Sequence, residues 1–355
     1  MPFAAYMAQA LYSPDHGYYS TGKARTGWAG HFVTSPELDP AFGALWARGF
    51  SEIWEATGTP DVFEVVEIGP GEGGFAAAVL SSVTGPFARA LRYRLVERSP
   101  VATQRQRETL KDHPEVTWVT SLNEIGRIDQ GIIIANEVLD NLPVHIVEQH
   151  AGHIQEIWVG EKDGRLVPLL NVPSNPDILG FLTRHNVSLR NGSRFEVGLA
   201  AETFVRQLVG LLNWGAVILI DYGATSAELM ARPEGTLVCY SSAGPDASPL
   251  EQPGEKDITS HANWTAVASA LDAAGAEVIG PLGQRDILVK LGLAEMDLVL
   301  REEHNKAMLK GKGAEAVRIL SRRQALGALA DPGGLGGLQT IFGLKEVVAP
   351  RFMRL

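Results

Sequence analysis

The sequence predicts an α/β protein with a parallel, Rossmann-like sheet, because apolar strand-like runs alternate with helical stretches along most of the chain. Two of these runs, 131–135 and 216–221, are apolar without alternation, which is typical of strands buried on both faces. A glycine-rich loop follows the first predicted strand at residues 69–73. Ligands of such sheets bind at the carboxyl ends of the strands, so we expect the functional site beside this loop.

The N-terminal part of the chain is predicted to be helical around an irregular loop. Residues 3–12 should form a short helix, and 13–33 a loop rich in Gly, Tyr, Ser and Thr. The next helix should begin at Ser35, a good N-cap, with Pro36 in the first helical position. It should run to about residue 56, since its apolar residues recur near the 3.6-residue period of a core-facing helix.

The later elements follow from the same signals. Ser99 should cap a helix, and Thr259 or Ser260 another. Residues 154–159 and 166–170 are predicted to form a hairpin. The expected strands of the main sheet are 62–68, 93–97, 116–119, 131–135, 216–221, 276–279 and 338–347, and the expected helices are 73–83, 99–111, 199–212, 262–274, 284–291 and 295–329.

Composition excludes several classes of protein. The net charge of −10 argues against a nucleic-acid-binding surface, which needs clustered Lys and Arg. One cysteine, Cys239, excludes an intramolecular disulfide and any multi-cysteine zinc site, and no metal site is predicted. The sequence contains no run of about 18 apolar residues, so no membrane span is predicted. The N-terminus also lacks the patterns of a secretory or organelle-targeting peptide, so a cytoplasmic location is expected.

The glycine loop fits two ligand-binding patterns. Residues 69–74 read GPGEGG, which satisfies both the dinucleotide GxGxxG and the GxGxG loop of S-adenosylmethionine (SAM) sites. A dinucleotide would bring a pyrophosphate to the following helix N-terminus, where Glu67 and Glu72 would repel it. SAM instead carries a sulfonium and an ammonium, which carboxylates attract. The acids favour SAM over NAD, and a turn without a ligand is the third alternative.

Polar side chains follow three other predicted strands. Glu97 ends the second strand, where an acid can accept hydrogen bonds from ribose hydroxyls. Glu137 and Asp140 follow the fourth strand; they either hold a substrate nitrogen or guanidinium, or cap a short helix. Asp221 and Tyr222 end the fifth. His261 is either a general base or a structural histidine near a helix start.

At this point the chain resembles the MidA-like family of SAM-dependent methyltransferases, which includes a mitochondrial complex I assembly methyltransferase. The resemblance extends almost from end to end, and the order and spacing of its segments make it specific. The segments are Tyr6-Met7, Leu11 to Pro14, Gly17-Tyr18-Tyr19, Phe32 to Glu37, Phe42-Gly43, Glu67 to Gly71, Asn136-Glu137 with Asp140, Leu142-Pro143, Asp221-Tyr222-Gly223, Pro253-Gly254-Glu255, Asp257-Ile258-Thr259 and Gly343-Leu344-Lys345.

This resemblance implies a class I methyltransferase fold and a protein substrate, with arginine as the methylated side chain. It implies that residues 1–60 form an N-terminal helical extension that covers the site. Residues 61–355 would form the methyltransferase domain, with insertions near 150–195 and 224–260. The expected cofactor contacts are Glu67, Gly69, Pro70, Gly71, Gly73, Glu97 and Asn136, the expected catalytic residues Glu137 and Asp140, and the expected substrate-side or site-covering residues Thr34, Ser35, Pro36, Glu37, Asp221, Tyr222 and His261.

The chain departs from the family pattern on the substrate side. The family usually has Asp where this chain has His31, and residues 284–288 replace a Gln-Gly-Phe-Leu-type segment. Two alternatives therefore stay open beside a protein methyltransferase. One is a methyltransferase for a small molecule, and the other is an assembly protein that binds SAM without catalysis.

Overall fold

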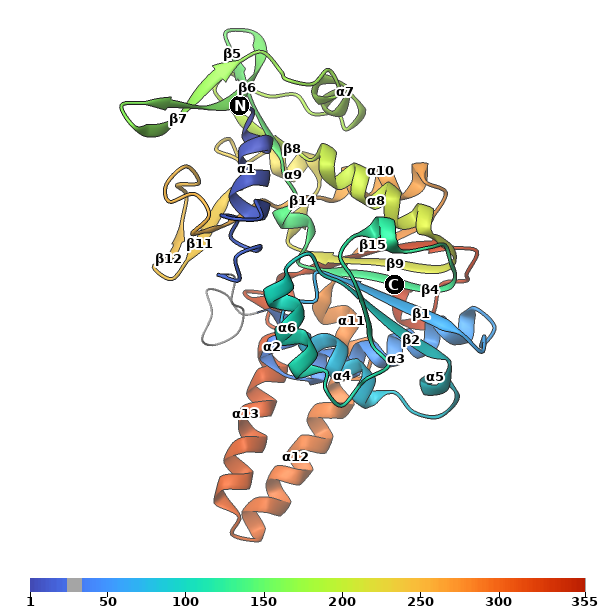
Figure 1. The fold of residues 1–355 in the computed structure, drawn as a ribbon. Coiled ribbons are helices and arrows are strands. Elements are labelled where there is room, and N and C mark those ends of the chain that lie inside the picture. The colour runs from blue at the N-terminus through green and yellow to red at the C-terminus, as the bar shows by residue number, and fades with distance from the viewer. Residues whose placement is uncertain (24–33, 355) are drawn as a thin grey trace.

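The computed structural model describes residues 1–23 and 34–354, and within them seven strands form one central sheet (Figure 1). The strand order is β15-β16-β9-β4-β1-β2-β3. The five strands β3, β2, β1, β4 and β9 are parallel, and β16 runs antiparallel to both of its neighbours, β9 and β15. This confirms the predicted α/β sheet. The strands are β1 (Phe63–Ile68), β2 (Leu91–Val96), β3 (Thr117–Val119), β4 (Ile128–Asn136), β9 (Leu212–Asp221), β15 (Glu277–Gly283) and β16 (Gln339–Lys345).

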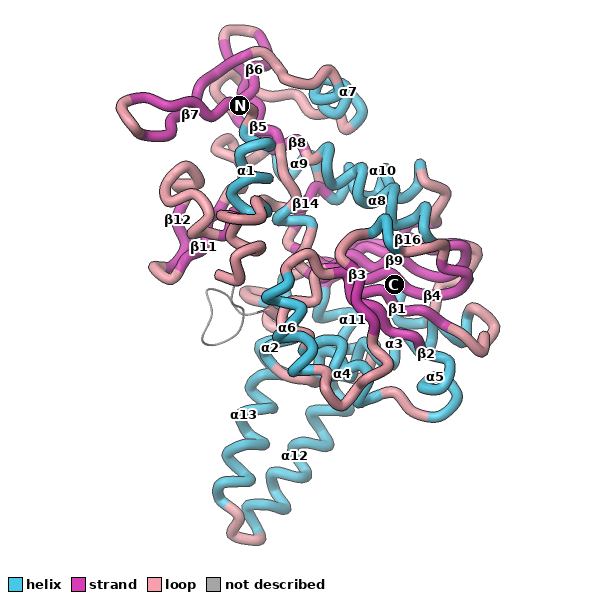
Figure 2. The backbone as a smooth tube through the Cα atoms, in the orientation of Figure 1, coloured by secondary structure: helices cyan, strands magenta, loops and turns pink. Residues whose placement is uncertain are grey.

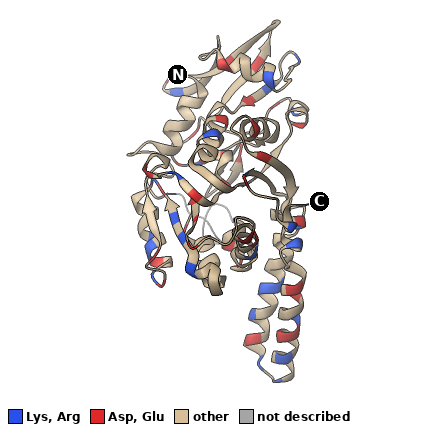
Figure 3. Ribbon diagram, turned by 90° about the vertical axis from the view of Figure 1, so that its right-hand side faces the viewer, with Lys and Arg blue, Asp and Glu red and all other residues tan. Residues whose placement is uncertain are grey.

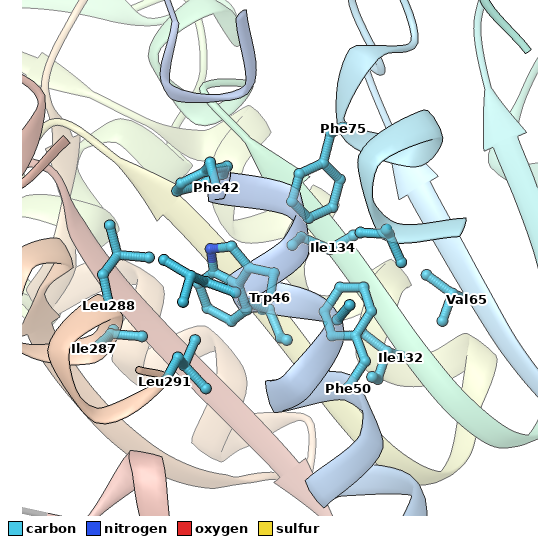
Figure 4. Close-up of a cluster of buried hydrophobic side chains, with 14 of the residues drawn as sticks. Phe42, Trp46, Phe50, Val65, Phe75, Ile132, Ile134, Ile287, Leu288 and Leu291 are labelled. Carbon is cyan, nitrogen blue, oxygen red and sulfur yellow. The ribbon is translucent and has the colours of Figure 1, made fainter. Parts of the chain in front are cut away.

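Alternate residues of the central strands pack on opposite faces of the sheet. On one face, Ile132 and Ile134 of β4 lie in a core with helices α3 (Ala41–Ala56), α4 (Gly74–Ser82) and α11 (Gln284–Lys290). Figure 4 shows Trp46 of α3 at the centre of this cluster. On the other face, Ile133 packs with α8 (Leu199–Leu211) and α10 (Trp264–Ala273). Burial on both faces explains why β4 is apolar without alternation.

The two predicted insertions form small antiparallel sheets beside the main one (Figure 2). The first contains the predicted hairpin, whose turn is confirmed by positive φ at Asp163 (52°) and Gly164 (75°). Its strands are β5 (His145–His150), β6 (His153–Lys162), β7 (Arg165–Asn171) and β8 (Arg194–Val197). The second holds β11 (Val238–Ser241), β12 (Gly244–Asp246) and β13 (Asp257–Thr259).

The N-terminal 60 residues pack in two places. Helix α1 (Phe3–Tyr12) shares a core with the two small sheets. Phe3 and Met7 of α1 belong to the same buried cluster as Ile146 of β5 and Ile258 of β13. Helix α3 instead packs on the main sheet. The first 60 residues are therefore divided between the small antiparallel sheets and the main sheet.

Three helix boundaries differ from the predictions. The expected helix from Ser35 is divided into α2 (Ser35–Leu38) and α3, and its N-cap is Thr34 in a capping box with Glu37. Asn263 caps α10, in place of Thr259 or Ser260: its Oδ1 accepts a hydrogen bond from the Ala266 N–H at 3.2 Å. A glycine turn at 310–312 divides the expected long helix into α12 (Leu293–Leu309) and α13 (Gly313–Leu329), which project together from the body (Figure 1).

The remaining elements are short. They are α5 (Gly85–Ala90), α6 (Pro100–Thr109), α7 (Asp177–Arg184), α9 (Ser226–Met230), β10 (Gly223–Ala224) and β14 (Ala262–Asn263), with 3-10 turns at Leu122–Glu124, Leu139–Asn141, Leu335–Gly337 and Arg351–Met353. Ser99 caps α6 as predicted, accepting from the Ala102 N–H at 3.4 Å. Among the described helices, none combines the length and apolar character needed to cross a membrane.

Candidate functional site

One cavity of about 1050 Å³ opens at the carboxyl ends of β1, β2 and β4, where the sequence predicted a ligand site. Its wall includes the glycine loop, the ends of the central strands, the α2 turn and tyrosines from the N-terminal part and the insertions. The predicted site residues that line it are Thr34, Pro36, Glu37, Glu67, Gly69, Pro70, Gly71, Glu97, Asn136, Glu137, Asp140 and Tyr222.

The glycine loop has the backbone geometry that only glycine adopts without strain. Gly69, Gly71 and Gly73 have φ values of 65°, 54° and 83°. A Cβ added at Gly69 would lie 2.9 Å from the Cγ2 of Val138, so the position also has no room for a side chain. Gly73 does not line the cavity; it is the N-cap of α4. The loop therefore presents backbone, rather than side chains, to a ligand.

The two acids beside the loop are less free than the sequence suggested. The Tyr93 hydroxyl donates a hydrogen bond to Glu67 Oε2 at 2.7 Å, and burial raises the pKa of Glu67 to about 7. Arg105 Nη1 donates to Glu72 Oε1 at 3.1 Å. The repulsion of a pyrophosphate is therefore weaker than two free carboxylates would produce, and the choice of SAM depends more on the rest of the site.

Glu97 is held in place at the end of β2. The Ser99 N–H donates to its Oε1 at 2.7 Å, and Gln106 Nε2 donates to its Oε2 at 3.0 Å. Gln106 also bonds the Gly71 carbonyl at 2.9 Å and accepts from Trp118 Nε1 at 3.1 Å. Gln106, which the sequence did not identify, thus connects the acid to the glycine loop across 35 residues.

Glu137 lies at the opposite side of the cavity, in a left-handed conformation with φ of 52°. Burial, followed by the neighbouring Asp221 charge, raises the pKa of Glu137 to about 8. Asn136 Nδ2 donates to Glu137 Oε1 at 3.0 Å, and the Ser35 backbone also hydrogen-bonds the carboxylate. Within the described part of the chain, the buried Oδ1 of Asn136 has no hydrogen-bond partner, so its capacity to accept a hydrogen bond is unused.

Asp140 and Asp221 are neighbouring carboxyl groups, but only Asp140 lines the cavity. Asp221 is fully buried behind the cavity wall, where its carboxylate accepts the N–H groups of Leu139 and Asp140 at 2.8 and 3.1 Å. It holds the turn that presents Asp140, rather than lining the site as predicted. Burial, then the charge of Asp221, raises the pKa of Asp140 well above its usual value. Among the described residues, Asp140 Oδ1 has no partner.

Asp257 of β13 brings a third carboxyl group to this side of the cavity. Asn141 Nδ2 donates to its Oδ1 at 2.8 Å, and the Tyr19 hydroxyl donates to Asn141 Oδ1 at 2.9 Å. Burial raises the pKa of Asp257 to about 7. Sequence reasoning assigned no role to Asp257, although it stands in one of the segments that carry the family resemblance.

The α2 turn lies against the start of helix α4, directly after the glycine loop. A Cβ added at Gly74 would lie 3.7 Å from the Pro36 carbonyl oxygen. Thr34, Pro36 and Glu37 line the cavity, whereas Ser35 is fully buried and its hydroxyl bonds Gln284 at 3.3 Å. The side chain of Ser35 is therefore structural, and only its backbone reaches Glu137.

The sequence left His261 as either a general base or a structural histidine, and its position favours the structural alternative. It lies beside a smaller, separate cavity, with its Nδ1 3.4 Å from Arg232 Nη1. Burial and then the Arg232 charge lower its pKa. His31, the departure from the family pattern, lies outside the described residues. Among the residues that the structure does describe, no cluster of three or more His, Cys, Asp or Glu side chains is arranged for a metal ion.

Gln284 belongs to the segment that departs from the family pattern, yet it supports the α2 turn. It is fully buried, and its Nε2 lies 3.1 Å from Ser35 Oγ, 3.1 Å from the Leu329 carbonyl and 2.9 Å from the Leu335 carbonyl. Through Ser35 it positions the backbone that bonds the Glu137 carboxylate.

Gln284→Leu is expected to lower the free energy of unfolding by about 1–3 kcal/mol, because buried hydrogen-bonding groups lose their partner. It should also move the pH profile of turnover to higher pH, since Glu137 loses a hydrogen bond that favours its charged form and its pKa rises. Thermal melting and rate-against-pH measurements check both effects, with the exposed Arg285→Leu as the control. A lower melting temperature with an unchanged pH profile would mean that Gln284 is structural only.

The raised carboxyl pKa values also predict how stability depends on pH. Glu67, Glu137, Asp221 and Asp257 have folded pKa values of about 7 or 8, above those of the unfolded chain. The folded state then binds more protons between about pH 4 and pH 8, so the free energy of unfolding falls as pH rises through this window. We expect the melting temperature of the ligand-free protein to drop from about pH 5 to about pH 8. A melting temperature that rises over this range would contradict the assignment.

Comparison with known proteins decides the family. The model of a family of S-adenosyl-L-methionine-dependent methyltransferases matches residues 45–282, about two thirds of the chain. The chain belongs to this family. The MidA-like resemblance is confirmed, and the protein is a SAM-dependent methyltransferase with the class I fold.

Relatives support the same assignment. The protein arginine methyltransferase NDUFAF7, mitochondrial, of Danio rerio is 27% identical over 86% of this chain and 76% of its own length. The Homo sapiens protein of the same name is 24% identical over 91% and 77%. Because these relatives are named as mitochondrial, the prediction of a cytoplasmic location is contradicted.

A solved structure matches over nearly the whole chain. It is a protein from Burkholderia thailandensis bound to S-adenosyl-homocysteine, with a TM-score of 0.85, 29% identity, and coverage of 99% of this chain and 90% of that one. A native crystal structure of a protein from the same organism gives a TM-score of 0.83 and 28% identity over 99% and 89%. The residues of the present site fit the cofactor, since the glycine-loop backbone, the oriented Glu97 and Asn136 all line one cavity.

Proposed function

We propose that the protein transfers the methyl group of SAM to an arginine side chain of a protein substrate. The observation that carries this proposal is the convergence of three carboxyl groups, Glu137, Asp140 and Asp257, in the cavity that also holds the glycine loop. A planar guanidinium presents five N–H donors, which several carboxylates can bind at once.

The cofactor would occupy the side of the cavity between β1 and β2. The backbone of Gly69, Pro70 and Gly71 would border the amino-acid part of SAM, with Glu67 behind the loop. Glu97 would accept hydrogen bonds from the ribose hydroxyls, since its carboxylate is already oriented by Ser99 and Gln106. When bound, SAM supplies an electrophilic methyl group.

The substrate would occupy the acidic side. Glu137 and Asp140 are the proposed catalytic residues, and Asp257 would complete the cation site. Their raised pKa values make these groups easier to protonate in the free protein than ordinary carboxyl groups. A bound cation favours the ionised form, so substrate binding should release protons and strengthen the charge-assisted hydrogen bonds that orient the guanidinium.

The relatives named as protein arginine methyltransferases support the choice of arginine over other cations. The tyrosines on the cavity wall, Tyr12, Tyr19, Tyr222 and Tyr240, would enclose the flat guanidinium and its aliphatic stem. Thr34, Pro36 and Glu37, together with residues 11–22, would cover the site as the predicted N-terminal extension.

Mass spectrometry of methylated proteins from cells with and without this gene tests the proposal. We expect at least one methylarginine that disappears with the gene and returns when the wild-type gene is restored. If every methylarginine persists while a methylated small molecule disappears, the protein acts on a small molecule instead. If neither changes, it binds SAM without catalysis.

A further inference from the structure

The hairpin of α12 and α13 extends beyond the rest of the molecule and ends in an apolar, basic tip (Figures 1 and 3). We define the hairpin tip as residues 306–312, the sequence KAMLKGK. The two helices pack through buried side chains that include Leu300, Ala307 and Ala316. This packing makes the hairpin a firm support for the tip.

The hairpin tip exposes apolar side chains that the fold does not use. Leu309 is 89% exposed, the largest fraction among the large apolar residues that the structure describes, and Met308 is 59% exposed. Both belong to the last turn of α12, and the turn at Gly311 follows them. An exposed apolar side chain this far from the core contributes little to folding. Its place at the end of a projection indicates contact with a membrane or another molecule.

The charge of the hairpin tip is opposite to that of the whole chain. Lys306, Lys310 and Lys312 lie within seven residues that contain no Asp or Glu, while the chain carries a net charge of −10. Lys306 and Lys312 contact flanking acids, Glu302 at 3.9 Å and Glu315 at 2.9 Å. These exposed pairs are weak, so they do not prevent the lysines from contacting stronger anions.

We propose that the hairpin tip binds the surface of an anionic lipid bilayer. Met308 and Leu309 would enter the boundary between headgroups and acyl chains, and the lysines would contact the lipid phosphates and carboxylates around them. Long lysine side chains suit this position, since their stems lie along apolar surface while the ammonium stays in water. Protein interfaces instead are depleted in lysine and enriched in aromatic residues, and the tip contains no Phe, Tyr or Trp.

Co-sedimentation of the full-length protein with vesicles tests this proposal. We expect binding to vesicles of phosphatidylcholine with about 30% phosphatidylserine to exceed binding to pure phosphatidylcholine at least ~5-fold at low salt. Raising the ionic strength should weaken it, since salt screens the lysines. Equal binding to both vesicles, or none to either, overturns the proposal.

Variants locate the contact. Met308→Ser with Leu309→Ser should reduce vesicle binding about 10-fold or more, because two apolar side chains no longer leave water. Lys310→Glu with Lys312→Glu should abolish the preference for anionic lipid. The matched control is Leu298→Ser with Val299→Ser, an equally apolar pair, 57% and 56% exposed, farther along α12. It should bind vesicles like the wild type.

Three further measurements keep the outcome clear. Melting temperature and SAM affinity should be unchanged in all three variants, which shows that the fold and the cofactor site persist. Analytical ultracentrifugation then shows whether the hairpin tip binds a second copy of the chain instead of lipid. A wild-type dimer that the tip variants convert to a monomer, or equal loss of vesicle binding in the control pair, contradicts a lipid-binding tip.

Discussion

Glu137→Gln is expected to reduce methyl transfer by about 10²-fold or more, the scale of losing a positioned catalytic group. Gln keeps the shape of the side chain but cannot become the carboxylate that orients a cationic substrate. SAM affinity and melting temperature should change little, because burial already keeps much of Glu137 protonated near neutral pH in the free protein. Turnover, calorimetric SAM affinity and thermal melting on this one variant measure the three quantities.

The control for this experiment is His261→Gln, since His261 lies outside the cavity and should leave turnover near the wild-type value. If Glu137 only stabilises its own turn, its amide variant should lose about 1 kcal/mol of stability or less and retain nearly full turnover. That result would remove Glu137 from the catalytic residues and leave Asp140 and Asp257 as the acidic groups of the site.

Gly71→Val should abolish measurable SAM binding. Gly71 has a φ of 54°, which a β-branched residue adopts only with strain, and its backbone borders the cavity. The added side chain would also occupy space that the ligand needs. Calorimetry with SAM and with S-adenosyl-homocysteine measures the loss, and NAD should bind neither the wild type nor the variant.

Gly126→Val provides the matched control, because a Cβ there meets no atom within 4 Å and Gly126 is exposed. Its SAM affinity should equal that of the wild type. If Gly71→Val bound SAM with wild-type affinity, the cofactor would have to lie elsewhere in the cavity. NAD binding tighter than SAM binding would contradict the cofactor assignment altogether.

The sheet could be predicted because its information is local. An apolar run such as 131–135 and a glycine loop such as 69–73 each show their structure within a few residues. The carboxyl-end rule then placed Glu97, Asn136 and Glu137 in one cavity without any knowledge of their contacts. Hydrophobic periodicity likewise predicted the helices, with errors at their ends.

The parts that could not be predicted depend on partners far away in the sequence. Nothing near Asp257 shows that Asn141, 116 residues earlier, will bring it to the cavity. Asp221 follows the end-of-strand rule, yet its carboxylate is used by the N–H groups of a turn 81 and 82 residues earlier. A general base and a structural histidine look alike in sequence, so His261 could be assigned only from the position of the cavity.

The most direct test of the central claim is the chemical identity of the methylated atom. The purified protein is incubated with methyl-labelled SAM and an extract of cells that lack the gene, and the labelled protein is hydrolysed to amino acids. We predict label in methylarginine with the wild type and its near absence with Glu137→Gln. Label in another amino acid, or only in small metabolites, would contradict a carboxylate site built for a protein guanidinium.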